Sequence, residues 1–473
     1  MRLLLLAIAL LPFALGLPDA LTRDLWYDEL WGLDHSVFVD WGRVLFEWQT
    51  PNQHVFWHVC CKLWLDLLGV HSTVEVLSAP WKLRILPVLF SLGALAYVYR
   101  AATLLAGSRL ALVALAFAAG SLPFLHFATQ ARGYSLSLLA LCACLAHGVR
   151  HLQTGRLRDA IVVGLSVALA LWTTPANGYV LLGLVTPLGV LAQRRCRARK
   201  LLAASFGGLA LALLVMAPIL PAIASYPGLA SRGPFRWATV TETMPAVFVG
   251  FAMAAPWLAI VVLLACRAPA VRGTIGLLAC ALVAPFVASF VRGDVPFQRV
   301  FFGLLPVVAM LIAVALRPLA CRRSARVAGI AVVVLVGGAL LAIRMRDQRI
   351  RLANTAGRVR QGLTDAYYIV GYAPSARIDS VARRALPLFV GVYDVYALPT
   401  YAQARGVDAR PLRELLAGAG ATPASHALVL GRGSAPLLRE LAAAGFATKL
   451  LSKPWAVHAL IEVNRERSVA RPR

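Results

Sequence analysis

Charged residues are scarce in this chain of 473 amino acids. Only 14% are Asp, Glu, Lys or Arg, whereas soluble domains carry about a quarter. Acidic residues are the scarcer sign, 21 against 47 basic residues, which gives a net charge of +26. Hydrophobic residues make up 60% of the chain. This composition excludes an ordinary soluble enzyme and indicates a chain that lies largely in lipid.

Cysteine is also sparse, and its placement excludes two kinds of site. The eight cysteines include none in residues 344–473, and their spacing fits neither a disulfide framework nor a zinc pattern. The favoured interpretation is that the eight cysteines are small buried residues. No zinc-finger spacing or other nucleic-acid signature accompanies the basic charge, so no nucleic-acid partner is expected.

The apolar residues occur in long runs, and each run approaches the roughly 20 residues that cross a bilayer core. Such runs must be helical, because a helix satisfies its own backbone groups in lipid. Eleven spans are predicted, at 3–17, 82–106, 109–128, 132–150, 158–174, 177–192, 201–221, 244–266, 273–291, 298–316 and 326–343. The chain is therefore predicted to be an all-α polytopic membrane protein over residues 1–343.

Arginine clusters set the predicted orientation. They fall in the short alternate loops at 150–158, 194–200, 267–272 and 317–326. The positive-inside rule places these loops and the N-terminus in the cytoplasm, which leaves the C-terminus outside. One bent span over 158–192 would put two of the clusters on opposite sides, so two spans are favoured. The first span has an alternative interpretation as a cleaved signal peptide, which leaves the downstream orientation unchanged.

Two long segments then face outward, 18–80 and 344–473. The first is acidic and rich in tryptophan, a residue typical of the membrane–water boundary. It is predicted to form two interfacial helices, at about 28–48 and 53–69. The second is predicted to be a small extracytoplasmic α/β domain with an accessory role. Its expected strands are 367–372, 389–395, 427–430 and 448–452, and its expected helices are 375–386, 411–419 and 435–444.

Asp28 and Glu29 are the candidate catalytic pair. Glycosyl transfer needs a base that deprotonates the acceptor hydroxyl, and carboxylates do this in most sugar chemistry. Adjacent residues on a helix point about 100° apart, so one can face the reacting centre while its neighbour binds another group. The alternative is that the pair only begins a helix, where acidic residues suit the positive end of the dipole.

Arginines and histidines at the predicted outer ends of spans are the remaining candidates. Arg132 and Arg299 can grip a phosphate with a planar bidentate fork, and the Tyr134 hydroxyl can join them. The alternative for both arginines is snorkelling to lipid headgroups. His54 and His58 have the i, i+4 spacing of metal ligands, although a structural role is the favoured interpretation.

Five short motifs, in order along the chain, resemble those of the GT-C membrane glycosyltransferases. This superfamily includes the protein O-mannosyltransferases, the aminoarabinose transferases of lipid A and the rhizobial lipopolysaccharide sugar transferases. The motifs are Trp26-Tyr27-Asp28-Glu29, Thr50-Pro51-Asn52-Gln53-His54 with Phe56-Trp57, Arg84-Ile85-Leu86-Pro87, Gln130-Ala131-Arg132-Gly133-Tyr134 and Gln298-Arg299-Val300-Phe301-Phe302. The second motif has one proline where the family often has two.

The resemblance implies a multi-pass enzyme of the cell membrane. It would move a sugar from a polyprenyl-phosphate donor to an extracytoplasmic glycan, lipid or protein acceptor, with no cofactor required and a divalent metal left open. Asp28 would be the base and Glu29 its assistant. Arg132, Tyr134 and Arg299 would bind the donor phosphate, and Trp26, Tyr27 and His54 would line the substrate pocket. The rival class is a transporter or lipid flippase, which usually shows internal repeats; none is evident here.

Overall fold

The fold is known from a computed structural model that describes the chain in segments. The described residues are 24–25, 27–49, 53–121, 124, 127–192, 195–225, 268–292, 302–320, 426–432, 434–444, 446–451 and 458–465, with shorter pieces of 6–22 and 388–415. Their contacts divide the chain into two units. The first comprises Met1–Leu21, Val39–Trp64 and Leu83–Met345; the second comprises Thr22–Phe38, Leu65–Lys82 and Arg346–Arg473.

The first unit is a bundle of apolar helices. Its long helices are α6 (Trp81–Ala106), α7 (Ser108–Gly120), α9 (Tyr134–Thr154), α10 (Leu157–Thr173), α11 (Asn177–Ala192), α12 (Cys196–Met216), α17 (Pro269–Arg292) and α18 (Leu305–Ala320). In the described part, α6, α9, α12 and α17 contain segments that are long and apolar enough to cross a membrane. The fold is thus mostly helical, with several apolar helices, as the sequence predicts.

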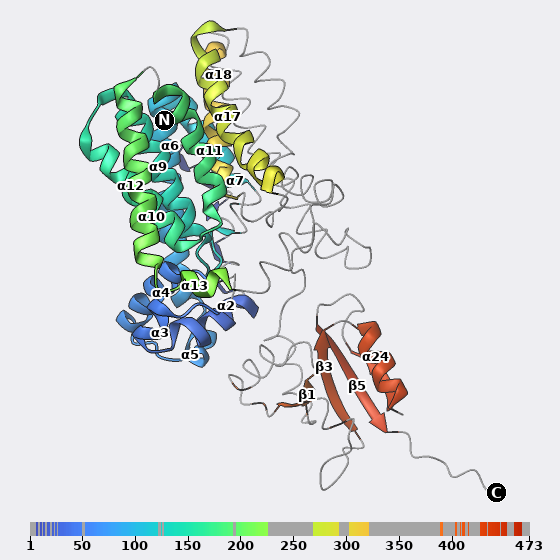
Figure 1. Cartoon of the computed structure of the whole chain (residues 1–473). Helices are drawn as coiled ribbons and strands as arrows, with labels where there is room; N and C mark the ends of the chain where they lie inside the picture. Colours follow the sequence, from blue (N-terminus) through green and yellow to red (C-terminus); the bar gives the residue numbers. More distant parts are fainter. Residues whose placement is uncertain are drawn as a thin grey trace, which may run out of the picture. The chain divides into compact units, whose positions relative to one another are not determined.

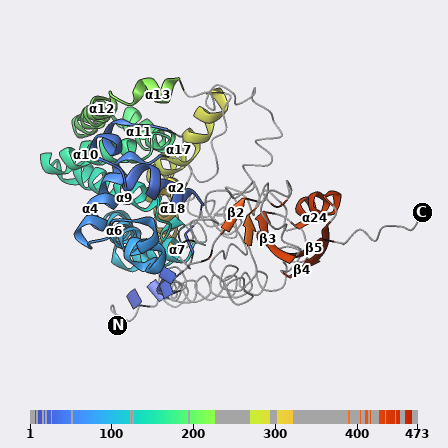
Figure 2. The same ribbon diagram turned by 90° about the horizontal axis from the view of Figure 1, so that it is seen from below.

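Helices α9, α10 and α12 lie side by side in both views (Figures 1 and 2). Small residues allow α10 and α12 to approach closely. A Cβ atom at Gly164 of α10 would lie 2.7 Å from the backbone oxygen of Ala204 in α12, so a larger residue would push the helices apart. Such contacts between small residues are typical of helices packed in lipid, where no hydrophobic force drives association.

Two arginines mark one end of this bundle, which we call the arginine-rich end. Arg197 at the start of α12 donates hydrogen bonds to the carbonyls of Leu152 and Gln153 at the end of α9, at 3.2 and 2.6 Å. Arg199 donates to the carbonyl of Ala192 at the end of α11, at 2.8 Å. The ends of α9 and α11 therefore meet the start of α12. Helices α10 and α11 consequently run in opposite directions as two separate helices, which confirms the predicted break between them.

The opposite end, which we call the Tyr134 end, carries three short helices. These are α3 (Trp41–Phe46), α4 (Val55–Leu67) and α13 (Leu220–Ala224), and Figure 1 shows them at one end of α9, α10 and α12. Val55 of α4 packs with Met216 and Ile219 at the end of α12, against the ring of Trp172. The structure thus confirms a helix within the predicted range 53–69, and this helix, α4, packs at one end of the bundle.

Eight predicted spans coincide with α6, α7, α9, α10, α11, α12, α17 and α18. The predictions at 244–266 and 326–343 lie outside the described residues, as does most of 3–17. The span predicted at 109–128 was too long, because α7 ends at Gly120. Pro123 follows shortly afterwards, and the residue before a proline is disfavoured in a helix.

The single helix predicted over 28–48 was wrong. The chain instead forms α2 (Tyr27–Gly32), which continues as a short π-helix, η1 (Leu33–Val37), and then breaks before α3. Asp40 is the physical reason for the restart. Its backbone is extended, and its side chain accepts a hydrogen bond from the Arg43 amide at 3.0 Å, so it caps a new helix.

The second unit contains a mixed five-stranded sheet in the order β2-β1-β3-β5-β4. The strands are β1 (Leu388–Val390), β2 (Ala409–Pro411), β3 (His426–Arg432), β4 (Phe446–Leu450) and β5 (His458–Arg465). The pairs β1–β2 and β1–β3 are parallel, and β3–β5 and β4–β5 are antiparallel. Helix α24 (Ser434–Ala443) packs Leu441 into a core with Val429, Phe446 and Ile461.

The predicted strands 389–395, 427–430 and 448–452 overlap β1, β3 and β4, and the predicted helix 435–444 overlaps α24. Strands β2 and β5 were not predicted. Most of the expected strand 367–372 and of the helices 375–386 and 411–419 lies outside the described residues. The second unit also includes α5 (Thr73–Ser78), which begins at the capping residue Ser72.

Candidate active site

The turn that precedes α9 gathers a cation and several aromatic rings. Arg132 and Tyr134 are both buried, with 4% and 7% of their surface exposed. The guanidinium carbon of Arg132 lies 5.0 Å from the centre of the Tyr134 ring, within the range of a cation–π contact. Phe127 packs against the same ring at 4.9 Å and against Phe302, just before α18, at 5.2 Å. Residues far apart in the sequence thus meet around Tyr134.

His54 joins this cluster from the residue before α4. It is 4% exposed, and its Nδ1 atom lies 2.8 Å from the hydroxyl of Thr174 in the turn between α10 and α11. The Ser137 hydroxyl of α9 donates to the same Thr174 oxygen at 3.2 Å. The edge of the imidazole contacts Tyr134, with ring centres 5.3 Å apart. His54 therefore links α4 to the Tyr134 end of α9 and α10.

Gly133 makes this close arrangement sterically feasible. A Cβ atom at this position would lie 2.8 Å from the Thr173 Cγ2 atom and 3.0 Å from the Cβ atom of His54. Only glycine fits without a shift of its neighbours. The sequence Arg132-Gly133-Tyr134 therefore has a packing reason for its central residue as well as candidate chemistry on either side.

His58 lies one helical turn beyond His54 and is buried. Burial, and next the nearby charge of Arg132, lowers the pKa of His58 to about 3. The imidazole is therefore neutral at physiological pH. Within the described residues, no group of three or more His, Cys, Asp or Glu side chains could hold a metal.

Arg84 is a buried residue near the cluster, and no functional role was predicted for it from the sequence. It is 3% exposed, and its Nη1 atom donates to the carbonyl of Thr129 at 2.8 Å. One residue earlier, the carbonyl of Ala128 accepts a hydrogen bond from Ser91 at 2.9 Å. A signal was present in the sequence, because Arg84 is a cation near the start of a span, as Arg132 is.

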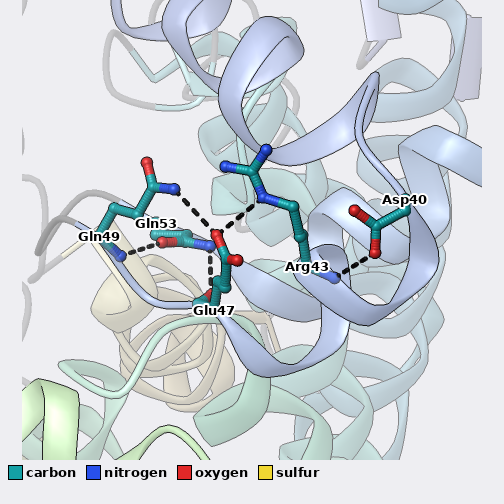
Figure 3. Close-up of polar contacts among 5 residues, drawn as sticks. All are labelled: Asp40, Arg43, Glu47, Gln49 and Gln53. Carbon is teal, nitrogen blue, oxygen red and sulfur yellow. Dashed lines mark hydrogen bonds and ion pairs between the residues drawn. The ribbon is translucent and has the colours of Figure 1, made fainter.

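A polar network lies just before His54 in the chain (Figure 3). Gln53, which is 3% exposed, accepts from the Gln49 amide at 2.7 Å and donates to the Glu47 carbonyl at 2.8 Å. The Glu47 carboxylate accepts from the Gln49 side chain at 3.2 Å and from Arg43 at 3.0 Å. The network ties α3 to the start of α4, and so fixes where the chain enters the cluster.

Asp28 and Glu29 lie in the second unit, on the first turn of α2. Asp28 is partly exposed, whereas Glu29 is 3% exposed. In the same unit Asp34 accepts a hydrogen bond from Thr73, and burial raises the pKa of Asp34. Trp26, Arg299 and the side chain of Tyr27 lie outside the described residues.

The structure therefore brings together three of the predicted residues, Arg132, Tyr134 and His54, with His58 beside them. These residues offer a guanidinium, a phenol and imidazoles in a buried setting that is lined with aromatic rings. Charge-assisted hydrogen bonds from arginine to phosphate are strong, and they gain strength where water is excluded. The arrangement is chemically suited to an anionic group that is attached to an apolar chain.

Comparison with known protein families gives a match over part of the chain. Residues 76–222 match the family described as dolichyl-phosphate-mannose-protein mannosyltransferase. This segment contains Arg84, Arg132, Tyr134 and Thr174. No curated protein matches the chain in sequence.

Two solved structures are similar in fold, both of ArnT from Cupriavidus metallidurans. The apo state matches with a TM-score of 0.59 and 15% identity, over 100% of this chain and 99% of that chain. The state bound to undecaprenyl phosphate matches with a TM-score of 0.57 and 16% identity, over the same shares of the two chains. The similarity in fold thus extends over the whole length of both proteins.

Proposed function

Because this chain shares the fold of the GT-C membrane glycosyltransferases and carries a segment of their mannosyltransferase family, we propose that it transfers a sugar from a polyprenyl-phosphate carrier to an acceptor. One observation carries the proposal: the matched segment contains the buried group of Arg132 and Tyr134, which is suited to a lipid-linked phosphate. The ArnT structure with undecaprenyl phosphate supports this class of donor.

The proposed reaction needs one base and one set of phosphate ligands. Asp28 takes the proton of the acceptor hydroxyl as that oxygen attacks the anomeric carbon of the sugar. The bond between the anomeric carbon and the phosphate oxygen breaks, and the polyprenyl phosphate leaves with the electron pair. Arg132, Tyr134 and Arg299 stabilise the charge on the departing phosphate. Glu29 assists Asp28, and Trp26, Tyr27 and His54 contribute to the substrate pocket.

The proposed enzyme spans the cell membrane with its reaction centre on the outer side. Contacts at the arginine-rich end support this orientation, since the end of α9 and the start of α12, which carries Arg197 and Arg199, lie at the same end of the bundle. Cytoplasmic loops carry such an excess of arginine. The N-terminus is then cytoplasmic, and the sheet in residues 388–465 is part of an extracytoplasmic accessory domain. The chemistry proposed for Asp28 and Arg132 requires no metal.

The test compares purified wild type with Asp28→Asn in detergent, using radiolabelled undecaprenyl-phosphate sugars as donors. Loss of the base should lower turnover by about 100-fold or more and leave folding intact. Asp66→Asn is the matched control, because Asp66 is an exposed carboxylate of the same outer segment. Its turnover should equal that of wild type.

Each outcome has a distinct meaning. Turnover by wild type and Asp66→Asn alone supports both the enzyme class and the base. Equal turnover by Asp28→Asn keeps the enzyme but removes Asp28 from its role. If folded wild type consumes none of the lipid-linked sugars, the glycosyltransferase proposal fails. Flux measurements in liposomes would then test the transporter alternative.

A further inference from the structure

Helix α6 binds two consecutive backbone carbonyls of the turn before α9. Arg84 donates to the carbonyl of Thr129 at 2.8 Å, and Ser91 donates to that of Ala128 at 2.9 Å. Both side chains are buried, at 3% and 0% exposure. They stand seven residues apart, which is two helical turns, and so share one face of α6.

The two carbonyls need these donors, because they belong to a turn and have no place in a helical hydrogen-bond ladder. A buried carbonyl without a partner is costly, so nearly all such groups in folded proteins are paired. Within the turn, the Ala128 amide binds the Phe124 carbonyl and the Arg132 amide binds the Gln130 carbonyl, each at 2.8 Å. The carbonyls that α6 binds therefore anchor the part of the turn that leads to Arg132.

The position of this turn sets the position of Arg132. Arg132 follows Thr129 by three residues and lies against the ring of Tyr134, the first residue of α9. The start of α9 is fixed by Gly133, which packs against Thr173 and His54. The turn is thus held at its end by α9 and in its middle by α6. A misplacement of about 1 Å in a binding group can cost around 100-fold in rate.

We propose that Arg84 and Ser91 are positioning residues that hold the turn at Ala128 and Thr129, and thereby aim Arg132 at the phosphate of the lipid-linked donor. The inference rests on the proposed function for the donor, and it adds two residues on α6 that act through Arg132. Ser91 carries no charge and cannot serve as a phosphate ligand in the way an arginine can. An effect of its substitution would therefore come from the position of the turn and not from a lost charge.

The experiment measures two quantities on the purified full-length protein. The first is the KM for a radiolabelled undecaprenyl-phosphate sugar, with kcat measured alongside. The second is amide hydrogen exchange in the peptide 127–134, which requires no activity. The variants are Arg84→Gln, Arg84→Lys and Ser91→Ala, with Arg84→Gln also made in an Arg132→Gln background. Controls are Arg197→Gln and Ser205→Ala, whose side chains also donate to backbone carbonyls but lie away from this turn.

The expected result is faster exchange in peptide 127–134 for Arg84→Gln and Ser91→Ala, but not for the two controls. The kcat/KM for the donor should fall about tenfold for Arg84→Gln and about threefold for Ser91→Ala. Arg84→Lys should retain part of the activity that Arg84→Gln loses. In the Arg132→Gln background, Arg84→Gln should cause little further loss of activity with the donor. The effects of two residues are not additive when one of them acts through the other.

Two results would overturn the inference. One is exchange at the wild-type rate in both α6 variants, which would mean that α6 does not hold the turn. The other is a full tenfold effect of Arg84→Gln in the Arg132→Gln background, which would mean that Arg84 contacts the phosphate itself. A wild-type protein without turnover would instead remove the proposed function, while the exchange rates would still decide whether α6 holds the turn.

Discussion

The two ends of the helical bundle use the same types of side chain for different purposes. At the arginine-rich end, Asp159 is buried with its carboxylate 2.7 Å from His147 and 3.5 Å from Arg150. Arg197 and Arg199 bind the carbonyls that end α9 and α11, where cations also suit the negative end of the helix dipole. These contacts of the charged groups therefore serve packing and capping.

At the Tyr134 end, the contacts of the charged and polar groups converge on a turn. Arg132 lies against Tyr134, His54 binds Thr174, and Arg84 binds the turn's backbone. A buried arginine or histidine is therefore not by itself a sign of function. What distinguishes the Tyr134 end is that residues of α4, α6, α9 and the turn after α10 meet there.

Loss of Asp159 should have the largest effect on stability and should separate the two ends. In Asp159→Ala, His147 and Arg150 lose the carboxylate that they share, which should lower the free energy of unfolding by about 3 kcal/mol. Donor KM should stay at the wild-type value, because the change lies at the other end of α10. Detergent-solubilised protein, unfolded by denaturant and followed by tryptophan fluorescence, gives the first quantity.

Asp159→Asn is the control for this variant, since it retains a hydrogen-bonding group beside His147 and should lose less stability. The comparison between the two ends would break down if Asp159→Ala raised the donor KM in protein that remains folded. That result would mean that the arginine-rich end is coupled to the binding of the donor.

Glycines give the next test, since each end has one at a tight position. Gly133→Ala would place a Cβ atom 2.8 Å from Thr173 and should cost about 1–3 kcal/mol through overpacking. It should also raise the donor KM, because Arg132 and Tyr134 flank it. At the other end, Gly155 has φ +74°, so Gly155→Ala is strained and should cost about 1 kcal/mol without any change in KM. The proposed difference between the two ends would be wrong if both glycine variants changed the donor KM, or if neither did.

Much of the Tyr134 end could be predicted from the sequence, because the signals are local. Arg132 and Tyr134 stand together at the start of an apolar run, and the turn at Thr174 separates two runs that α10 and α11 occupy. The partners of these residues could not be predicted. The contacts of Arg84 with Thr129 and of His54 with Thr174 join residues 45 and 120 positions apart, and no local pattern encodes such distances.

The elements that were not predicted from the sequence have local physical causes. The helix break before α3 depends on Asp40 acting as a cap, a role that any aspartate in an amphipathic stretch could take. Strand β2 has only three residues and is defined by its pairing with β1. For β5 a signal existed, because Ile461 and Val463 are buried and alternate with Glu462, which is typical of a strand.

Substitution of His58 should have the smallest effect on stability at neutral pH, and its effect should depend on pH. The folded protein holds the pKa of His58 near 3 by burial and the charge of Arg132, whereas an unfolded histidine titrates near 6.5. Between these values the unfolded chain binds the extra proton, so stability present above about pH 6.5 is lost as the pH falls toward 3. In His58→Gln this contribution is absent. The thermal midpoint should therefore fall less steeply between pH 6.5 and 4 than in wild type, with the two proteins closest at pH 7.5. Parallel curves for the two proteins would mean that His58 does not stay neutral beside Arg132, and that the Tyr134 end admits a second positive charge.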